Sequence, residues 1–429
     1  MNPELRRNLW LELSAHRLLA TPAIIALVGA LILANSDGNG YPVLATVAGF
    51  ASLVLLAAWG SKMAADGIGD EARNRTWDAQ RLTSIGPWQM TFGKLAGATA
   101  FAWYGGGLCL LVFIVAGVGQ LPAPVLRLAG LIVAGSVLCH AVAFTGSLMA
   151  AQRNPATRST NALVWMFVLL SAASSARRWL TVDQGTVAWW GASHASVNFV
   201  LVSAIVFAAW AVFGAYRSMC SALHVPTTPW ALVVFLCFVS VYLAGFASQS
   251  NGSVLGLVAV TGVGVSLAAG YGLLFMEQTG AMTLRRLQMR ISRRQWLEAQ
   301  QELPGWPVAL LLGLLFAIGT RFASIRDGGT WAIADAAFVF WLFAVRDAAL
   351  MHCFAFARQP RRVVATTVLY LALLYGLLPW LLKALGAHAL ASLLLPFSID
   401  YSGPNTAAAA AAVQAVIVVG IAAWRWRRL

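Results

Sequence analysis

The sequence predicts an all-α polytopic membrane protein with about twelve transmembrane helices. Hydrophobic residues fill 60% of the 429 positions and charged residues only 10%, whereas a typical soluble domain carries about 25% charged residues. Apolar runs near the ~20 residues needed to cross a bilayer core recur along the whole chain. Lys and Arg residues gather in the segments that emerge on one side of these runs. The pattern leaves no room for a soluble catalytic domain.

The expected spans divide evenly between the two halves of the chain. Those of the first half cover residues 18–34, 43–65, 95–118, 125–149, 162–180 and 196–216. Those of the second half cover residues 230–246, 254–276, 306–325, 331–357, 363–385 and 407–424. An even number of spans returns both termini to the same side of the membrane.

The distribution of positive charge predicts the orientation. If the N-terminus starts in the cytoplasm, 22 of the 29 Lys and Arg residues fall in cytoplasmic segments. The positive-inside rule therefore places both termini in the cytoplasm. A net charge of +14 could also indicate nucleic acid, but a nucleic-acid face clusters its basic residues on one folded surface. Here they are dispersed at helix ends, so the expected partner is the lipid bilayer and not nucleic acid.

The N-terminal residues 3–19 have the pattern of an interfacial helix. Leu5, Leu9 and Leu13 share one stripe, and the charged residues lie elsewhere around the helix. Thr21 followed by Pro22 then predicts the start of the first span, because Thr can cap a helix and Pro is tolerated in its first turn.

Two long cytoplasmic segments, residues 66–94 and 277–305, occupy equivalent positions after the second and eighth spans. A shift of 206 residues matches three pairs between them, which are Glu71 with Glu277, Ile85 with Ile291, and Gln89 with Gln295. The matches indicate two parallel six-helix halves, residues 1–222 and 223–429. Halves of this kind are related by an axis along the membrane normal.

Segment 66–94 also carries a recognisable motif. It contains, in order, Glu71, Thr76-Trp77, Leu82-Thr83, Pro87 and Gly93-Lys94-Leu95. This pattern resembles the loop between spans two and three of the ABC-2 family of ABC transporter membrane subunits. The resemblance extends over residues 1 to about 220, since that family also has an N-terminal interfacial helix and six spans. It fades in the second half, where Arg293 and Arg294 replace Pro87 and Trp88.

The resemblance implies a partner and a membrane. In the ABC-2 family this loop holds a coupling helix that docks on a separate nucleotide-binding subunit. It implies an ABC ATPase partner, as a dimer, and a location in the bacterial cytoplasmic (inner) membrane. The residues implied in ATPase coupling are Asp70, Glu71, Arg75, Thr76, Trp77, Leu82, Pro87 and Gln89.

The chain itself offers no expected catalytic, cofactor or metal site. Gly86 and Gly93-Lys94 do not form a phosphate-binding loop, because six residues instead of four separate the glycines and Leu95 follows the lysine. The five cysteines lie singly in or beside apolar runs, without disulfide or zinc spacing, as packing residues do. The histidines are also scattered. ATP hydrolysis is therefore expected in the separate partner.

Several polar residues fall inside predicted spans, where a central charge costs about 2.5 to 3.5 kcal/mol. The candidates for an intramembrane polar path are His140, Asp335, Arg346, Asp347 and His352. Neighbouring positions 346 and 347 point about 100° apart on a helix, which predicts imperfect pairing. Asp335 can share a face with Arg346, and His140 matches Arg346 under the repeat shift. The set is either a substrate or proton path or an interhelical structural pair.

Three functions remain open on the sequence. The first is the permease subunit of an ATP-driven exporter. The alternative is an ion-coupled secondary transporter of major-facilitator type, whose short loop between spans two and three is loosely similar to Asp66-Gly67 and residues 73–75. That loop is brief, however, whereas about twenty residues separate Arg75 from Leu95 here. The third is a membrane assembly factor or lipid-modifying enzyme.

Overall fold

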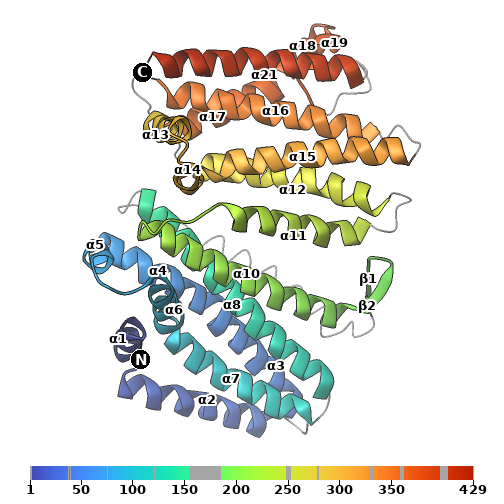
Figure 1. Ribbon diagram of the computed structural model, residues 1–429. Coiled ribbons are helices and arrows are strands. Elements are labelled where there is room, and N and C mark those ends of the chain that lie inside the picture. Colours follow the sequence, from blue (N-terminus) through green and yellow to red (C-terminus); the bar gives the residue numbers. More distant parts are fainter. Residues whose placement is uncertain are drawn as a thin grey trace. The chain divides into compact units, whose positions relative to one another are not determined.

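The computed structural model describes residues 2–36, 38, 40–74, 76–119, 122–153, 185–247, 253–277, 280–327, 332–357, 362–396 and 404–428. Within these ranges, 11 helices are long and apolar enough to cross a membrane. The fold is therefore that of an all-α polytopic membrane protein, as the sequence predicts (Figure 1). The expected span at 162–180 lies outside the described residues.

Contacts divide the chain into two units, Met1–Val187 with Ser193–Thr227, and Ala188–Ala192 with Thr228–Leu429. The helices of the first unit are α1 (Pro3–Glu12), α2 (Ala15–Asn35), α3 (Gly40–Leu53), the π-helical segment η1 (Val54–Trp59), α4 (Gly60–Arg73), α5 (Thr76–Arg81), α6 (Pro87–Ala98), α7 (Ala100–Val118), α8 (Pro122–Arg153) and α10 (Ser196–Ala222). A two-stranded hairpin of β1 (Thr186–Trp189) and β2 (Ala192–Ala195) precedes α10.

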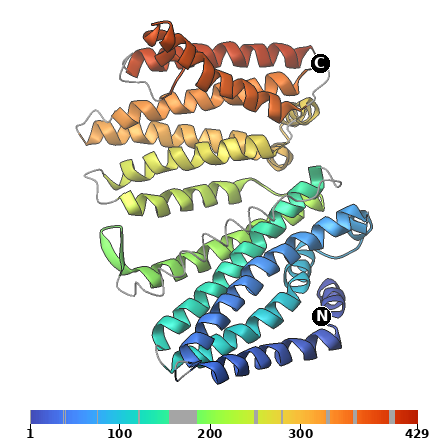
Figure 2. The same cartoon turned by 180° about the vertical axis from the view of Figure 1, so that it is seen from behind.

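The second unit is also built from helices. These are α11 (Trp230–Ala247), α12 (Val254–Met276), α13 (Ala281–Ser292), α14 (Trp296–Glu302), α15 (Gly305–Arg326), α16 (Ala332–Ala355), α17 (Val363–Ala372), the π-helical segment η2 (Leu373–Leu377), α18 (Leu378–Ala384), α19 (His388–Leu393) and α21 (Pro404–Arg427). Figure 2 shows the same elements from behind.

Similar helix pairs build the two units. In the first unit α3 packs against α7, α4 against α8, and α8 against α10. In the second unit α12 packs against both α15 and α16, and α16 packs against α21. The repeat of two halves stays a prediction, but α8 and α16, which the 206-residue shift matches, each lie between the corresponding neighbours.

The predicted spans agree with the helices at most boundaries, and the largest differences lie near the N-terminus. The predicted span 254–276 coincides with α12. The second span, expected at 43–65, continues as helix from Gly40 to Arg73. It is longer because the polar residues after position 65 remain helical, with Ile68 and Ala72 on a buried face.

The expected single helix over residues 3–19 and the span start at Thr21-Pro22 are wrong. The first helix ends at Glu12, and α2 begins at Ala15. Ser14 causes the break, because its side chain accepts a hydrogen bond from the backbone N–H of Arg17 at 3.5 Å and so caps α2. Pro22 therefore lies inside α2 instead of at its start.

A proline inside a helix removes one backbone hydrogen bond, and α7 supplies a replacement here. Pro22 has no N–H with which to reach the carbonyl four residues earlier, which belongs to Leu18. The Tyr104 hydroxyl donates to the Leu18 carbonyl oxygen at 2.7 Å. One side chain of α7 thus satisfies the acceptor that the proline leaves open.

Replacing Tyr104 by Phe should lower the stability of the protein by about 1 kcal/mol, because the Leu18 carbonyl then loses its donor. The loss should shrink in a Pro22→Ala background, where the introduced alanine supplies the missing N–H. The thermal midpoint of the detergent-purified protein measures both effects. Tyr41→Phe, at a tyrosine that is 62% exposed, is the control. Equal losses from Tyr104→Phe in both backgrounds would contradict the assignment.

Candidate functional site

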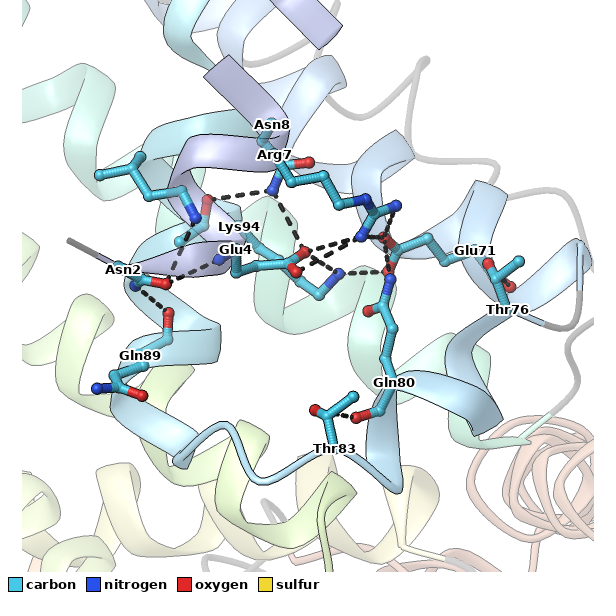
Figure 3. A network of polar contacts seen from close by, with 12 residues as sticks. Asn2, Glu4, Arg7, Asn8, Glu71, Thr76, Gln80, Thr83, Gln89 and Lys94 are labelled. Carbon is cyan, nitrogen blue, oxygen red and sulfur yellow. Dashed lines mark hydrogen bonds and ion pairs between the residues drawn. The ribbon is translucent and has the colours of Figure 1, made fainter. Parts of the chain in front are cut away.

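A network of buried charges lies where α1, α4 and α6 meet (Figure 3). Its centre is Lys94 on α6, whose side chain is only 2% exposed. The Lys94 Nζ lies 3.0 Å from Glu4 Oε1 on α1 and also pairs with Glu71 Oε2 on α4. One lysine therefore links two carboxylates from segments far apart in the sequence.

Arg7 completes the network from the solvent side. Its Nη1 lies 3.2 Å from Glu4 Oε1, and its Nη2 lies 3.3 Å from Glu71 Oε1. Two carboxylates thus meet two cations, so the buried group carries no excess charge. Lys94 Nζ also lies 5.6 Å from the centroid of the Trp77 ring, within the range of a cation–π contact.

Two glycines let α1 approach α6 closely enough to form this network. A Cβ atom at Gly93 would lie 2.8 Å from the Glu4 Cβ, and one at Gly97 would lie 2.6 Å from the Asn8 Cβ. Asn8 donates to the Gly93 carbonyl at 3.3 Å, and Asn2 donates to the Gln89 carbonyl at 2.6 Å. Any larger residue at either glycine would push α1 away from Lys94.

The short helix α5 is fixed by its inward side. Gln80 donates to Glu71 Oε1 at 2.7 Å, and the Thr76 hydroxyl donates to the Glu71 carbonyl at 3.3 Å. Trp77 is buried in a cluster with Ile68 of α4 and Phe144 of α8. The same carboxylate that binds Lys94 therefore also positions α5.

The outward side of α5 and the residues after it are open. Leu82 is 89% exposed. The Asp78 side chain is 79% exposed and lies 3.5 Å from Arg81. Arg81 also contacts His224, which follows α10. The loop thus presents an apolar side chain and an acidic one on a segment whose base is rigidly attached.

The residues predicted for ATPase coupling separate into inward and outward groups. Glu71 and Trp77 contact this chain's own core, as described above, and Pro87 begins α6. The exposed members are Asp70, Thr76, Leu82 and Gln89. Arg75 lies outside the described residues. Their role in coupling stays a prediction.

Sequence reasoning missed the partners of Glu71. Lys94 belongs to the motif, but neither it nor Glu4 and Arg7 was expected to form a site. Two signals were present. Glu4 and Arg7 have the spacing of an ion pair on a helix, and Gly93 and Gly97 are four residues apart, as in close helix contacts. Neither signal identifies the helix that fits against the glycines.

The second unit contains a buried ion pair on α16. Arg346 Nε and Nη2 both donate to Asp347 Oδ1, at 2.9 and 2.8 Å. The expected imperfect pairing is wrong, because the long Arg346 side chain brings its guanidinium around the helix. Tyr271 and Tyr375 donate to Asp347 Oδ2 at 2.8 and 2.7 Å, and Arg346 Nη1 donates to Gln414 at 2.7 Å.

The remaining candidates of the polar path lie elsewhere. Asp335 pairs with Arg321 of α15 at 2.7 Å, so it does not continue a line from Arg346. His352 Nδ1 contacts the Ala348 carbonyl at 2.7 Å and packs against Trp306, with ring centroids 4.8 Å apart. In the described residues, the predicted set therefore forms separate contacts instead of one continuous path.

His140 fills a gap made by the π-helical segment η1. Its Nε2 lies 2.6 Å from the Leu56 carbonyl oxygen. In an α-helix that oxygen would accept from the N–H of Gly60, but this N–H instead contacts the carbonyls of Leu55 and Ala57. A Cβ at Gly60 would clash with His140 Nε2. The histidine thus has a structural partner in the first unit.

Glu277, the counterpart of Glu71 under the repeat shift, caps another helix. It follows the end of α12 and accepts from the N–H of Gly305 at 2.8 Å and of Trp306 at 3.3 Å. A carboxylate at a helix N-terminus is favoured by the helix dipole. Burial raises the pKa of Glu277 above its ordinary value of 4.5, and the two N–H donors partly offset that rise.

The described residues contain no group of three His, Cys, Asp or Glu side chains arranged to hold a metal ion. Comparison with family models, with curated proteins and with solved structures finds no match. The proposal for function therefore rests on the residues of this chain and on the motif they form.

Replacing Lys94 by Met should destabilise the protein by about 3–5 kcal/mol, because it removes the buried cation shared by Glu4 and Glu71 and leaves them only the half-exposed Arg7. The fraction that remains monodisperse after heating in detergent measures the loss. Lys62→Met is the matched control, since Lys62 pairs with Asp66 at 2.6 Å but is 62% exposed. The control should cost at most about 1 kcal/mol. Equal losses would show that Lys94 is not central.

Glu277 should make stability depend on pH. Because its folded pKa lies above 4.5, the folded protein binds more protons than the unfolded chain above that pH. Stability should fall as the pH rises from about 4.5 through the raised pKa and then level off. Thermal midpoints of the detergent-purified protein, measured across this pH range, test the expected fall in stability. Glu277→Gln should remove that component of the slope, whereas Glu298→Gln, at a half-exposed glutamate, should keep it. An unchanged slope in Glu277→Gln would exclude Glu277 as its source.

Proposed function

We propose that this protein is the membrane-spanning permease subunit of an ATP-driven transporter of the ABC type, working as an exporter with a separate ATPase. The observation that carries the proposal is the construction of α5. This short helix follows α4 and precedes α6, and it is held to them by the bond from Gln80 to Glu71 and by the packing of Trp77. Leu82, directly after its end, is exposed. A docking element that transmits force needs both properties.

The attachment of α5 suggests how force passes into the membrane. Glu71 lies at the end of a helix that runs from Gly40 to Arg73, and its carboxylate bonds to Gln80 of α5 and to Lys94 of α6. A displacement of α5 is therefore delivered to α4 and α6 together. Trp77 adds a packed contact to the same base. A partner that closes on α5 would move these helices as one group.

The motif in the sequence supports the same function. Its residues divide between those that hold the loop, such as Glu71 and Lys94, and an exposed tip at Leu82. This division gives the ABC-2 pattern a physical meaning in this chain, because the charged residues of the motif would serve the base and the exposed tip would meet the partner. The bacterial inner membrane and cytoplasmic termini belong to the same proposal.

The ion-coupled alternative draws less support from the described residues. A proton or ion path needs polar groups that follow one another through the membrane. Asp347 instead has its carboxylate occupied by Arg346 and two tyrosine hydroxyls, and Asp335 is paired with Arg321. A buried pair with all of its partners is better suited to fixing helices than to exchanging protons.

Exchanging Leu82 for Asp should weaken ATPase association by at least about tenfold, because a charge replaces an exposed apolar anchor at the proposed interface. Affinity purification of the tagged protein in mild detergent, with mass spectrometry of bound proteins, measures the association. Leu385→Asp is the matched control, since Leu385 is 73% exposed but follows α18 in the second unit. Both variants should elute as the wild type does in size exclusion.

Two results would contradict the proposal, the first as a whole and the second in its docking element. One is repeated recovery of the wild-type protein without any nucleotide-binding subunit. The other is an ATPase that remains bound at the wild-type level to Leu82→Asp and also to Asp78→Arg. The second result would leave an ATP-driven transporter but remove α5 as its docking element.

A further inference from the structure

An apolar cavity of about 520 Å³ lies in the second unit between α13 and the ends of three long helices. Leu287 and Ile291 of α13 form one wall, and Pro307 of α15, Ala349 of α16 and Ala423 of α21 contribute to the others. Its volume is within the range of small-molecule sites. The lining is almost wholly apolar, which suits a hydrocarbon chain.

Positive charge surrounds this cavity on two sides. The segment formed by α13 and α14 contains five arginines and two glutamates, and both glutamates pair with Arg290, at 3.5 and 3.0 Å. The other four arginines are exposed, and none of their guanidinium groups pairs with another described residue. They are Arg285, Arg286, Arg293 and Arg294. The end of α21 adds Arg425, Arg427 and Arg428 beside the lining residue Trp426.

Helix α13 separates its apolar and charged residues by helical register. Leu284, Leu287 and Ile291 recur at the spacing of one helix face and line the cavity. Arg285 lies about 100° from Leu284 around the helix and Arg286 about 200°, so the arginines flank and oppose the apolar stripe. This is the pattern of a helix that lies at a membrane surface and attracts anionic lipids.

One residue that lines the cavity carries a buried polar atom without a hydrogen-bond partner among the described residues. The indole Nε1 of Trp426 is buried and has no hydrogen-bond partner among the described residues. Trp426 lines the cavity near the basic end of α21. Buried indole N–H groups usually have an acceptor, but this N–H is covered by the protein and does not open into the cavity.

We propose that this cavity binds one acyl chain of an anionic phospholipid from the surrounding bilayer, with the phosphate held by the arginines of α13. The cavity supplies the apolar contact with the acyl chain, and the arginines supply the charge that attracts the phosphate. The site belongs to the second unit alone and does not depend on the proposed function. A zwitterionic lipid with the same acyl chains makes the same apolar contact with the cavity, but its headgroup is attracted less strongly by the arginines.

Native mass spectrometry of the full-length, delipidated protein tests the proposal. The protein is incubated with equal amounts of phosphatidylglycerol and phosphatidylcholine that carry the same acyl chains. The first bound lipid should be phosphatidylglycerol by about tenfold or more, since each basic residue near a lipid headgroup contributes about fivefold. Arg285→Gln with Arg286→Gln should bring the two lipids close to parity.

Further variants distinguish the contribution of the cavity to lipid binding from that of the charge. Ala423→Trp fills the cavity from an exposed position on α21 and should reduce retention of both lipids. Its matched control is Val416→Trp, at a position on the same helix that is 71% exposed and does not line the cavity. The charge control is Arg326→Gln at the far end of α15, about 30 Å from Gly305. Neither control should change the first binding step.

The proposal is overturned if the wild-type protein takes up both lipids equally, or if the lipid preference survives loss of both arginines. It is also overturned if Ala423→Trp retains lipid as the wild type does while it remains folded by thermal midpoint. Lipid binding measured in this way needs no ATPase, so its failure is distinct from failure of the proposed function.

Discussion

The first unit depends on a single buried ammonium group. The Lys94 side chain is only 2% exposed. Burying a cation costs free energy unless the cation is paired and hydrogen-bonded. Glu4 and Glu71 provide that pairing from two segments that precede it in the sequence. Their requirement for one another fixes α1 on α6, fixes the end of α4, and determines where α5 lies. The loop is therefore a product of charge neutralisation more than of its own helical propensity.

The second unit solves a related problem with different chemistry. Glu71 lies in the last turn of α4, and Glu277, which matches it under the repeat shift, directly follows α12. Glu277 binds the backbone N–H groups at the start of α15 instead of a lysine. In both units a carboxylate at one helix end therefore bonds to a later helix, within α6 in the first unit and at the start of α15 in the second. The polar residues within the membrane-spanning helices follow the same rule, because Arg346 and Asp347 meet partners from α12, η2 and α21.

Much of the fold follows from hydropathy, because a bilayer allows only long apolar helices or closed barrels. For this reason the bounds of α12 and α15 could be predicted from the sequence to within one residue. The break at Ser14 was missed because Pro22 is the stronger helix signal in the sequence, and only the tertiary contact from Tyr104 makes an internal proline acceptable. The partners of Glu71 were missed because a sequence gives charge and spacing but not which helices touch.

The π-helical segment η1 has a consequence for Glu71, twelve residues beyond Trp59. Each residue of such a segment turns the chain by less than the 100° of an α-helix, so the residues after it lie about 100° away from where an unbroken α-helix would place them. If residues 54–59 were α-helical, the carboxylate of Glu71 would point about a quarter turn away from Lys94, and α5 would lose its anchor. The direction of a charge at the membrane surface is thus set by the number of residues in a bulge about 18 Å below it.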